Sequence, residues 1–397
     1  MSKLGQKQTV IALVGGGTGG HIVPLKIIAK DILEREGDYK ILVVTNNGYF
    51  EKTKQIFAEV VKEYGEQVEI KKVAGGRFRR YGRGTLRELL DVRVQLLNAR
   101  DIVKSVVGVI QAKLILRRDR PAVIFCKGGT GALEFCFAAR KKIPIIVHDS
   151  DSRPGMTNKT VARWAKRLLK GMPNSSKEAT LSDDKDLVGI PVDEDFKPRD
   201  GREVELLREE LGLKIENKTV LVTGGSLGAA KINELIFCTI NDLNKLGIQV
   251  LHQTGSLDST NRAKGIRKQL IKPKLYRPFS FSSDMPKLYG AADLVVARSG
   301  ATTIQELANS SKPAILIPAT LTDQKKNAGI IKELGAALVA DQKDLLDRPE
   351  EFISMVQFAL EDSNFRSSIK KSVDILAKRN VGRDIADILL NTIERAN

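Results

Sequence analysis

The sequence contains few of the residues that carry metal, redox or membrane-spanning chemistry. Among 397 residues there are only three cysteines, three histidines and one tryptophan. Cys126, Cys136 and Cys238 are odd in number and lack metal-ligand spacing, which argues against a disulfide framework and fits a reducing cytoplasm. No apolar run approaches the ~18 to 20 residues needed to span a bilayer. The polar N-terminus leads into an apolar run too brief for a secretory signal.

Negative charge is also scarce in the first part of the chain. The net charge is +17, and all of the excess falls within residues 1–173, while the remainder is balanced. A one-sided positive field predicts an anionic partner. Acidic lipid headgroups, nucleic acid and a polyanionic substrate all meet that description.

Short apolar runs alternate with helical stretches, and the chain begins the same pattern twice. Residues 10–14 and 218–223 each predict a strand that leads through a glycine turn into a helix. This alternation predicts an α/β protein with two Rossmann-like domains, parallel sheets and ligands at the strand carboxyl ends. Further strands are expected at 39–44, 122–126, 143–147, 250–253, 294–297 and 314–317, with a strand or extended segment at 188–192. Helices are expected near 23–33, 51–66, 86–117, from 231 onward and at 285–291.

Composition divides the chain into four parts. Residues 1–173 form the expected N-terminal domain, and the polar stretch 174–202, with three prolines, forms an interdomain region. Residues 203–372 form the expected C-terminal domain. The last part, 373–397, is expected to be a helix that packs back on the N-terminal domain.

The first glycine turn excludes two common nucleotide sites. Gly15, Gly17 and Gly20 satisfy G-x-G-x-x-G, but a dinucleotide site also needs an acid at the end of the second strand. That strand ends in Thr45-Asn46-Asn47, and no P-loop lysine follows the glycines. The pattern therefore favours neither a nicotinamide cofactor nor a P-loop nucleotide.

The stretch from Arg298 to Glu306 predicts a nucleotide diphosphate site. An apolar strand precedes it, and a helix is expected to start near Thr302 or Thr303. The first turn of a helix attracts anions, and Arg298 adds a permanent cation. Glu306, about one turn into the helix, would accept hydrogen bonds from the paired hydroxyls of a ribose. The alternative interpretation is that Thr303 to Glu306 is only a capping box.

Several short motifs, taken in order, resemble the MurG family of membrane-associated N-acetylglucosaminyltransferases, which have the GT-B fold. The resemblance covers almost the whole chain. It rests on Gly16-Gly-Thr-Gly-Gly-His21 with Pro24, Gly128-Gly129, His148 with Gly155-Met-Thr-Asn158, Gly224-Gly-Ser-Leu-Gly-Ala229, His252-Gln-Thr-Gly255, Asp284-Met285, Arg298-Ser-Gly-Ala301 with Glu306, and Asp323-Gln324 with Asn327-Ala328.

The resemblance implies inverting transfer of N-acetylglucosamine from UDP-GlcNAc to lipid I, an undecaprenyl-diphosphate-linked muramyl pentapeptide, with lipid II as product. It implies a peripheral enzyme on the cytoplasmic face of the bacterial plasma membrane, without a required cofactor. The donor contacts it implies are Gly225, Ser226, Leu227, Gly228, Phe281, Ser282, Met285, Arg298, Gly300, Ala301, Thr302, Glu306, Asp323 and Gln324. The acceptor contacts it implies are Thr18, Gly19, Gly20, Gly128, Gly129, Thr130, His148 and Asp151.

Four positions depart from the family pattern. The chain has His148-Asp-Ser-Asp151 where the family often has His-Glu-Gln-Asn, and Thr130 where an aromatic residue is frequent. Asp193 stands where an arginine is common, and Leu227 where a glutamine is frequent. Three of these changes lie in or beside the acceptor half, so the acceptor is less well defined than the donor.

An inverting transfer needs one general base on the acceptor hydroxyl. All three histidines are expected at strand–loop junctions, and His21 at a helix start is the first candidate, because the helix dipole disfavours imidazolium there. The alternative is that His21 only bonds backbone and shapes its loop. Asp151, oriented by His148, is the rival base. Asp149-Ser-Asp151 also resembles a D-x-D metal motif, but it lies in the wrong domain for the donor phosphates, so no metal is required and only weak Mg²⁺ binding is expected.

Basic-apolar segments in the first domain predict contact with an anionic membrane surface. They are the Arg77–Arg87 loop, Lys113–Arg118 and Arg163–Lys170. The loop could equally be a solvated surface, and its Phe78 and Tyr81 could stack RNA bases. The membrane is favoured because all three segments mix basic and apolar residues, and no nucleic acid is expected.

Three other functions stay open. One keeps the UDP-sugar donor but uses another lipid acceptor, such as diacylglycerol. Another is a UDP-GlcNAc 2-epimerase on the same fold, which would need no lipid. The third is a basic RNA-binding protein, and the glycine turn with His21 argues against the last two.

Overall fold

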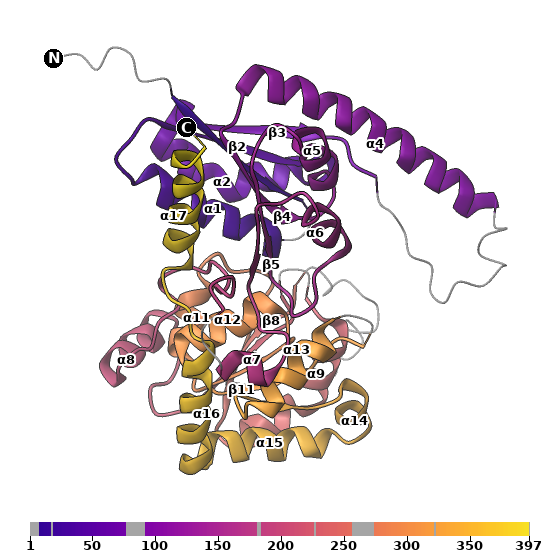
Figure 1. Cartoon of the computed structure of the whole chain (residues 1–397). Coiled ribbons are helices and arrows are strands. Elements are labelled where there is room, and N and C mark those ends of the chain that lie inside the picture. Colours follow the sequence, from indigo (N-terminus) through magenta and orange to yellow (C-terminus); the bar gives the residue numbers. More distant parts are fainter. Residues whose placement is uncertain are drawn as a thin grey trace. The chain divides into compact units, whose positions relative to one another are not determined.

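The computed structural model describes residues 8–16, 19–76, 92–180, 184–225, 228–255, 274–320 and 323–396. The chain divides into two compact units (Figure 1). The first unit comprises Met1–Gly171, Lys185–Pro191 and Asn380–Asn397, and the second comprises Met172–Asp184 and Val192–Arg379.

The first unit contains a six-stranded sheet in which every pairing is parallel. Its strand order is β3-β2-β1-β4-β5-β6. The strands are β1 (Thr9–Gly15), β2 (Tyr39–Asn46), β3 (Val68–Val73), β4 (Val123–Gly128), β5 (Ile145–Asp149) and β6 (Arg167–Lys170).

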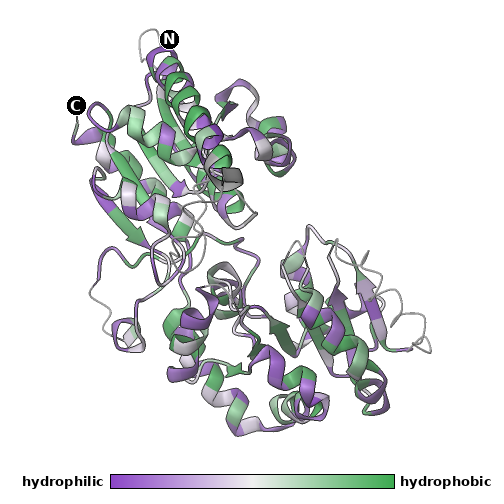
Figure 2. Cartoon of the chain, turned by 90° about the vertical axis from the view of Figure 1, so that its right-hand side faces the viewer, coloured by the Kyte–Doolittle hydropathy of each residue, from purple (hydrophilic) through white to green (hydrophobic). Residues whose placement is uncertain are grey.

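Helices cover both faces of this sheet, which explains why its inner strands are almost continuously apolar. Along β1, Ile11 and Leu13 join one buried cluster with α1, α2 and α17, while Ala12 and Val14 join another with α4, α5 and α6. Figure 2 shows mostly hydrophobic strands inside each unit and surrounding helices that carry both hydrophilic and hydrophobic residues. The helices are α1 (Gly19–Leu33), α2 (Phe50–Tyr64), α4 (Val92–Asp119), α5 (Ala132–Ala139), α6 (Met156–Val161) and α17 (Val381–Glu394).

The second unit repeats the same topology. Its parallel sheet has the order β12-β11-β10-β7-β8-β9. If the strands of each unit are numbered from its own first strand, both sheets have the Rossmann order 3-2-1-4-5-6. The strands are β7 (Thr219–Thr223), β8 (Gln249–Gln253), β9 (Tyr276–Phe279), β10 (Leu294–Ala297), β11 (Ala314–Leu316) and β12 (Leu338–Val339).

One face of the second sheet packs against α9, α14 and α15 in a single buried cluster. The helices of this unit are α7 (Ser176–Thr180), α8 (Gly201–Glu210), α9 (Ala230–Lys245), α11 (Met285–Ala291), α12 (Ala301–Ser310), α13 (Gln324–Glu333), α14 (Gln342–Asp347), α15 (Pro349–Glu361) and α16 (Ser363–Leu376).

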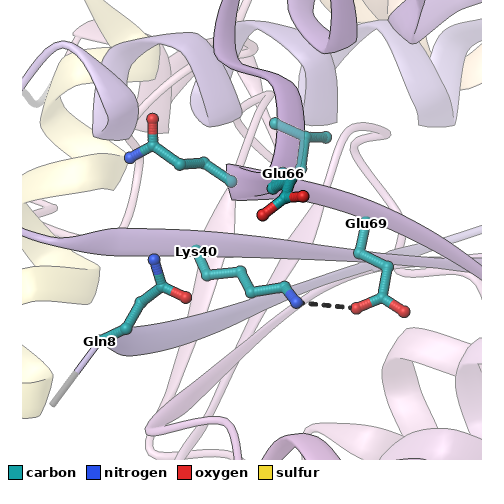
Figure 3. A pocket seen from close by; sticks show the side chains of 6 residues that line it. Gln8, Lys40, Glu66 and Glu69 are labelled. Carbon is teal, nitrogen blue, oxygen red and sulfur yellow. Dashed lines mark ion pairs between the residues drawn. The ribbon is translucent and has the colours of Figure 1, made fainter.

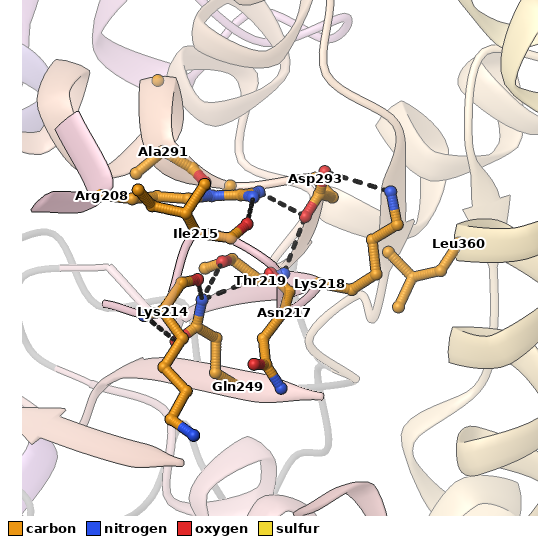
Figure 4. Close-up of polar contacts among 12 residues, drawn as sticks. Arg208, Lys214, Ile215, Asn217, Lys218, Thr219, Gln249, Ala291, Asp293 and Leu360 are labelled. Atoms are coloured by element: carbon orange, nitrogen blue, oxygen red, sulfur yellow. Dashed lines mark hydrogen bonds and ion pairs between the residues drawn. The ribbon is translucent and has the colours of Figure 1, made fainter. Parts of the chain in front are cut away.

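A polar network fastens α8 to the amino ends of β7 and β10 (Figure 4). Arg208 is buried and donates to the carbonyl oxygens of Ala291 and Ile215 and, at 2.6 Å, to Asp293 Oδ2. The same oxygen of Asp293 accepts from the Thr219 amide at 2.7 Å. The buried guanidinium therefore has a carboxylate partner, which a charge inside a protein requires.

A cavity of about 490 Å³ lies beside the amino ends of β1, β2 and β3 (Figure 3). An ion pair of 2.9 Å joins Lys40 Nζ to Glu69 Oε2 there. Ligands of parallel α/β sheets bind at the opposite, carboxyl edge. The cavity is therefore not the candidate active site.

The predicted strands correspond to the eight inner strands of the two sheets. The four strands missed by sequence are β3, β6, β9 and β12, and all four are edge strands. An edge strand has one neighbour and less cover, so it tolerates polar residues, as Val-Glu-Ile-Lys-Lys-Val of β3 does. The predicted segment 188–192 is not a strand but extended chain that follows one bridge between Lys170 and Leu187.

Helix α4 is the longest of the described helices and carries several exposed apolar side chains. Figure 1 shows it extending beyond the sheet that it covers. It is described from Val92 to Asp119, and residues 86–91 of the predicted helix fall outside the described residues. Within the described part of the chain, no helix combines the length and hydropathy needed to cross a membrane.

Candidate active site

The carboxyl ends of β1, β4 and β5 lie side by side and bring the predicted acceptor residues to one edge of the first sheet. Two glycine turns interlock there. The Gly16 amide donates to Gly128 O at 3.0 Å, and Gly129 has φ of +88° with its Cβ position only 1.7 Å from Gly16 O. Only glycine allows that approach. Gly19 and Gly20 open α1 and Thr130 follows Gly129, whereas Thr18 lies outside the described residues.

His21 lies in the first turn of α1, which begins earlier than the sequence predicted. Its Nδ1 is 3.2 Å from Lys127 O. A carbonyl oxygen only accepts hydrogen bonds, so Nδ1 carries the proton and the lone pair of the neutral ring is on Nε2. Burial, and then the charge of Lys127, hold the pKa of His21 below its ordinary value. His21 is therefore a neutral imidazole near pH 7 whose Nε2 can act as a base.

The carboxylate of Asp149 organises the segment that follows β5. It accepts from the amides of Asp151 at 3.1 Å and Gly155 at 2.9 Å, and from Asn158 Nδ2 at 2.7 Å. These bonds place Asp151 at the carboxyl edge. They also occupy Asp149, which weakens the D-x-D interpretation. Among the described residues, no group of three or more His, Cys, Asp or Glu could hold a metal ion.

The expectation that all three histidines face ligands at strand–loop junctions is wrong for two of them. His148 is inside β5 and fully buried, with Nε2 2.7 Å from Gly189 O and Nδ1 2.6 Å from Lys127 Nζ. Neither ring nitrogen is left to orient Asp151, so His148 supports the acceptor turn from within. His252 is inside β8, bonded to Tyr276 and Asn233, and burial lowers its pKa to about 3.

Sequence reasoning passed over Lys127. This lysine ends the apolar run of β4 directly before the second glycine turn, and it is buried. Its Nζ lies 2.5 Å from Ser150 Oγ as well as near His148. A cation at the end of an otherwise apolar strand was the available signal.

The predicted donor residues gather at the carboxyl edge of the second sheet. The turn after β7 is held by Thr223 Oγ1, which donates to Gln253 Oε1 at 2.6 Å. A Cβ on Gly228 would lie 2.3 Å from Thr254 O, whereas one on Gly225 would meet none of the described residues within 4 Å. The Gly225 side of the turn is therefore open, and Ser226 and Leu227 lie outside the described residues.

Helix α12 begins at Ala301, with Gly300 as its N-cap. The helix thus starts one or two residues earlier than predicted, and Thr303 is its third residue. The alternative that Thr303 to Glu306 forms a capping box is therefore wrong. The first amides of α12, including that of Thr302, have no partner within the helix and favour an anion.

Glu306 lies in the second turn of α12. Tyr289 Oη donates to Glu306 Oε2 at 3.2 Å, and Tyr289 was not predicted as a site residue. Burial raises the pKa of Glu306 to about 7, although the hydrogen bond from Tyr289 opposes the shift. A half-buried carboxyl that accepts from Tyr289 keeps capacity to accept from a diol.

Arg298 and Gln324 build the loops around the donor edge. Arg298 donates to Ile317 O at 2.9 Å and to Gln342 Oε1 at 2.7 Å. Gln324 Oε1 accepts from the Ala319 amide at 3.0 Å. These bonds hold the segment between β11 and α13 against the start of α12.

The remaining predicted donor residues lie at Asp323 and after β9. Asp323 is the N-cap residue of α13. After β9, Phe281 is exposed, Ser282 Oγ accepts from the Asp284 amide, and Met285 opens α11.

Two family profiles match most of the chain. The profile of the glycosyltransferase family 28 N-terminal domain matches residues 11–170, and that of its C-terminal domain matches residues 219–382. The chain belongs to glycosyltransferase family 28. The two matches coincide with the two sheets, so both candidate edges lie within the family's own domains.

Close relatives cover nearly the whole chain. A UDP-N-acetylglucosamine--N-acetylmuramyl-(pentapeptide) pyrophosphoryl-undecaprenol N-acetylglucosamine transferase from Flavobacterium psychrophilum is 30% identical over 98% of this chain and 99% of its own length. A protein of the same name from Staphylococcus carnosus is 30% identical over 96% and 97%. The resemblance to the MurG family is confirmed, and the chain is a glycosyltransferase.

Solved structures agree on the fold. MurG from Acinetobacter baumannii matches with a TM-score of 0.66 at 20% identity, over 97% of this chain and all of that one. A UDP-N-acetylglucosamine 2-epimerase matches with 0.64 at 12% identity, over 98% and 97%. The predicted GT-B fold is confirmed, and the family match rather than these structures separates transferase from epimerase.

Proposed function

We propose that this glycosyltransferase moves N-acetylglucosamine from UDP-GlcNAc to the muramyl sugar of lipid I, with inversion, and forms lipid II. The observation that carries the proposal is the donor edge, where Arg298, the start of α12 and the half-buried Glu306 follow one another after β10. The relatives named for this transfer cover nearly the whole chain and support it.

The donor would use the carboxyl edge of the second sheet. The diphosphate would lie against the turn at 224–229 and the first amides of α12. Glu306 would accept hydrogen bonds from the ribose hydroxyls, and backbone near Phe281 and Ser282 would read the uracil. Asp323 and Gln324 would contact the sugar. Every one of these positions follows the carboxyl end of a strand, where such sheets bind ligands.

The acceptor would use the carboxyl edge of the first sheet. Its diphosphate would lie at the start of α1 and beside the turn at 128–131. His21 Nε2 would take the proton from the muramyl hydroxyl as its oxygen bonds to the anomeric carbon. The bond from that carbon to UDP breaks on the opposite side, and UDP leaves with the electron pair. Asp151 is the competing base, and no protein nucleophile is required.

The chemistry needs no resident metal or cofactor. The charge that develops on the leaving diphosphate would be stabilised by the α12 start and by Arg298. Mg²⁺ would bind only weakly, as a companion of the substrate phosphates.

The first unit would dock on an anionic membrane surface from the cytoplasmic side, without nucleic acid. The support is α4, whose side chains Leu96, Val103, Val106, Ile110 and Leu114 are between 53% and 67% exposed. Lys104, Lys113, Arg117 and Arg118 lie on the same helix. Apolar side chains among bases suit a headgroup interface.

Two other predicted membrane segments contribute less to this argument. The Arg77–Arg87 loop lies outside the described residues. The segment 163–170 ends in the edge strand β6, where Leu169 is buried and Arg167 pairs with Asp186 at 2.8 Å. The prediction that this segment is a membrane surface is therefore not supported.

A turnover assay tests the function. UDP-GlcNAc is incubated with the enzyme in the presence and absence of a lipid I analogue, and both UDP and glycosylated product are measured. We expect UDP release that depends on the analogue and matches product. An epimerised UDP-sugar without acceptor would reassign the chain as a 2-epimerase, and transfer to diacylglycerol instead of lipid I would reassign the acceptor.

A further inference from the structure

Lys127 is a buried lysine that none of the steps above uses. Only 1% of its surface is exposed, and it lies in β4 directly before the second glycine turn of the acceptor edge. Its Nζ is 2.6 Å from His148 Nδ1 and 2.5 Å from Ser150 Oγ, and its carbonyl oxygen is 3.2 Å from His21 Nδ1. A buried ammonium destabilises a fold unless it is compensated, so its presence at this point needs a reason.

The contacts of Lys127 fix the tautomers of two histidines. Gly189 O accepts from His148 Nε2, so His148 Nδ1 has the lone pair and accepts from Lys127 Nζ. Lys127 O accepts from His21 Nδ1, so His21 has its lone pair on Nε2. One residue therefore contacts the candidate base through its backbone while its side chain is held by His148 and Ser150.

We propose that Lys127 is a positioning residue for the transfer, which rests on the base role proposed for His21. Its carbonyl holds the His21 ring with Nε2 as the base atom. Its ammonium, held by His148 and Ser150, opposes protonation of that ring. A base must be neutral before it can take the proton of the acceptor hydroxyl, so both contacts favour the reactive form. Lys127 itself touches neither substrate nor reacting atoms.

The charges that face His21 come from β4 and from the end of β5. After burial, the charge of Lys127 is the next cause that lowers the pKa of His21, and Asp149 and Asp151 raise it. The balance keeps the pKa of His21 below its ordinary value of 6.5. Lys127 is thus the cation that offsets two carboxylates.

The charge on Lys127 is present in the pH range that matters. Burial lowers the pKa of Lys127 to about 7, against Asp149, Asp151 and Cys126, which raise it. Because the pKa of His21 is held below 6.5, we expect Lys127 to carry its proton in the acid range where His21 would gain one. His148 adds no charge, because burial holds its pKa well below the ordinary value.

The three histidines of the chain allow a direct test on the full-length protein. Labelling with ¹⁵N- and ¹³C-histidine gives three imidazoles whose titration and tautomer are read by NMR. In the wild type we expect His21 as the Nδ1–H tautomer with a midpoint below 6.5. In Lys127→Met the carbonyl remains and the ammonium is lost, so the His21 midpoint should rise toward its ordinary value. His252, in the second unit, is the internal control and should not move.

Kinetics provide the second readout. The acid limb of kcat/KM against pH should shift upward in Lys127→Met by the same interval as the His21 midpoint. Adding Asp151→Asn to Lys127→Met should move both back toward the wild type, because a lost positive charge is then offset by a lost negative one. A merely structural role would lower turnover at every pH and leave the limb in place.

The outcomes separate this proposal from the proposed function. An unchanged His21 midpoint in folded Lys127→Met, or an unmoved acid limb, overturns the role of Lys127 even if the enzyme makes lipid II. If Lys127→Met does not fold, the wild-type protein still provides a test. An Nε2–H tautomer of His21, or a His21 midpoint at or above 6.5, would overturn the role of Lys127. If the wild-type protein has no transferase activity in the turnover assay, the proposed function is rejected. That result is independent of the NMR measurement on His21.

Discussion

The hydroxyl of Tyr289 donates a hydrogen bond of 3.2 Å to Glu306 Oε2. Tyr289 lies in α11 and Glu306 in α12, so the contact joins the helices on either side of β10. Burial raises the pKa of both groups, that of Glu306 to about 7. A carboxylate is thus kept in an environment that disfavours its charge, at the place proposed for the ribose.

Glu306→Ala is expected to weaken UDP-GlcNAc binding while the fold survives. Loss of a charged hydrogen bond costs roughly 1.5–3 kcal/mol. Calorimetric titration of UDP-GlcNAc measures the loss, and the melting temperature is the control. Tyr289→Phe removes the partner but keeps the carboxyl, so it should weaken binding much less. Unchanged affinity in Glu306→Ala would disprove the ribose role.

UDP-GlcNAc affinity should also depend on pH. The ionised carboxylate accepts from both ribose hydroxyls, whereas the protonated form gives up part of that capacity. With a pKa of about 7 for Glu306, affinity should rise from pH 6 to pH 8. UDP-GlcNAc is a suitable probe because its diphosphate has no secondary ionisation in this range. Glu306→Gln should flatten the dependence, and an equally steep dependence in that variant would assign it to another group.

The same carboxyl should make the second unit less stable at high pH. The pKa of Glu306 is raised from 4.5 in the unfolded chain to about 7, so the folded state binds its proton more tightly. The stability it contributes is complete below about 4.5 and is lost as pH rises through about 7. Glu306→Gln should therefore raise the melting temperature at pH 8 and change it little at pH 4.5. A lower melting temperature at pH 8 would contradict the cost assigned to this charge.

The inner strands were predictable from sequence because burial on both faces leaves an unbroken apolar run, as in Val123 to Cys126. The glycine turns were also predictable from sequence, because a position such as Gly129, where no side chain fits, has to be glycine. The edge strands were not, because their pairing is decided by a neighbour that lies elsewhere in the sequence. β12, of two residues, carries no pattern at all.

The place of the candidate donor edge was predictable where one motif spans a strand end and a helix start, as from Arg298 to Glu306. The contacts of the candidate site were not predictable where partners come from separate strands. Tyr289 meets Glu306, and Lys127 meets His148, only through the fold. His148 was interpreted as a ligand contact because its place before a loop was visible in the sequence, while its complete burial was not.

Replacing Val103, Ile110 and Leu114 of α4 by Ser should reduce binding to anionic vesicles. These side chains are 62%, 53% and 59% exposed, so the fold should be little affected, while each buried leucine-sized side chain contributes about 1.5–3 kcal/mol at an apolar interface. Co-sedimentation with vesicles measures the change. Turnover of a short-chain soluble acceptor should stay near the wild-type rate.

The control for α4 lies in the second unit. Leu206 and Leu246 are 57% and 47% exposed, and their replacement by Ser should leave vesicle binding unchanged. Replacing Arg77, Arg79, Arg80 and Arg83 by Ser tests the neighbouring basic loop, at about 1 kcal/mol per base near the surface. Equal binding by wild type and the α4 variant would remove α4 from the membrane surface.

His21→Ala should lower kcat by about 10²–10⁴-fold, the range expected when a general base is lost. His21 presents an unprotonated Nε2 because Nδ1 donates to Lys127 O. Donor affinity should barely change, because the donor is expected on the other unit.

Asp151 is the rival candidate for the general base, although no ring nitrogen of His148 is left to orient it. Asp151→Asn should therefore leave turnover largely intact. Both variants are compared at saturating donor and acceptor. If Asp151→Asn abolishes turnover while His21→Ala keeps most of it, the base is Asp151.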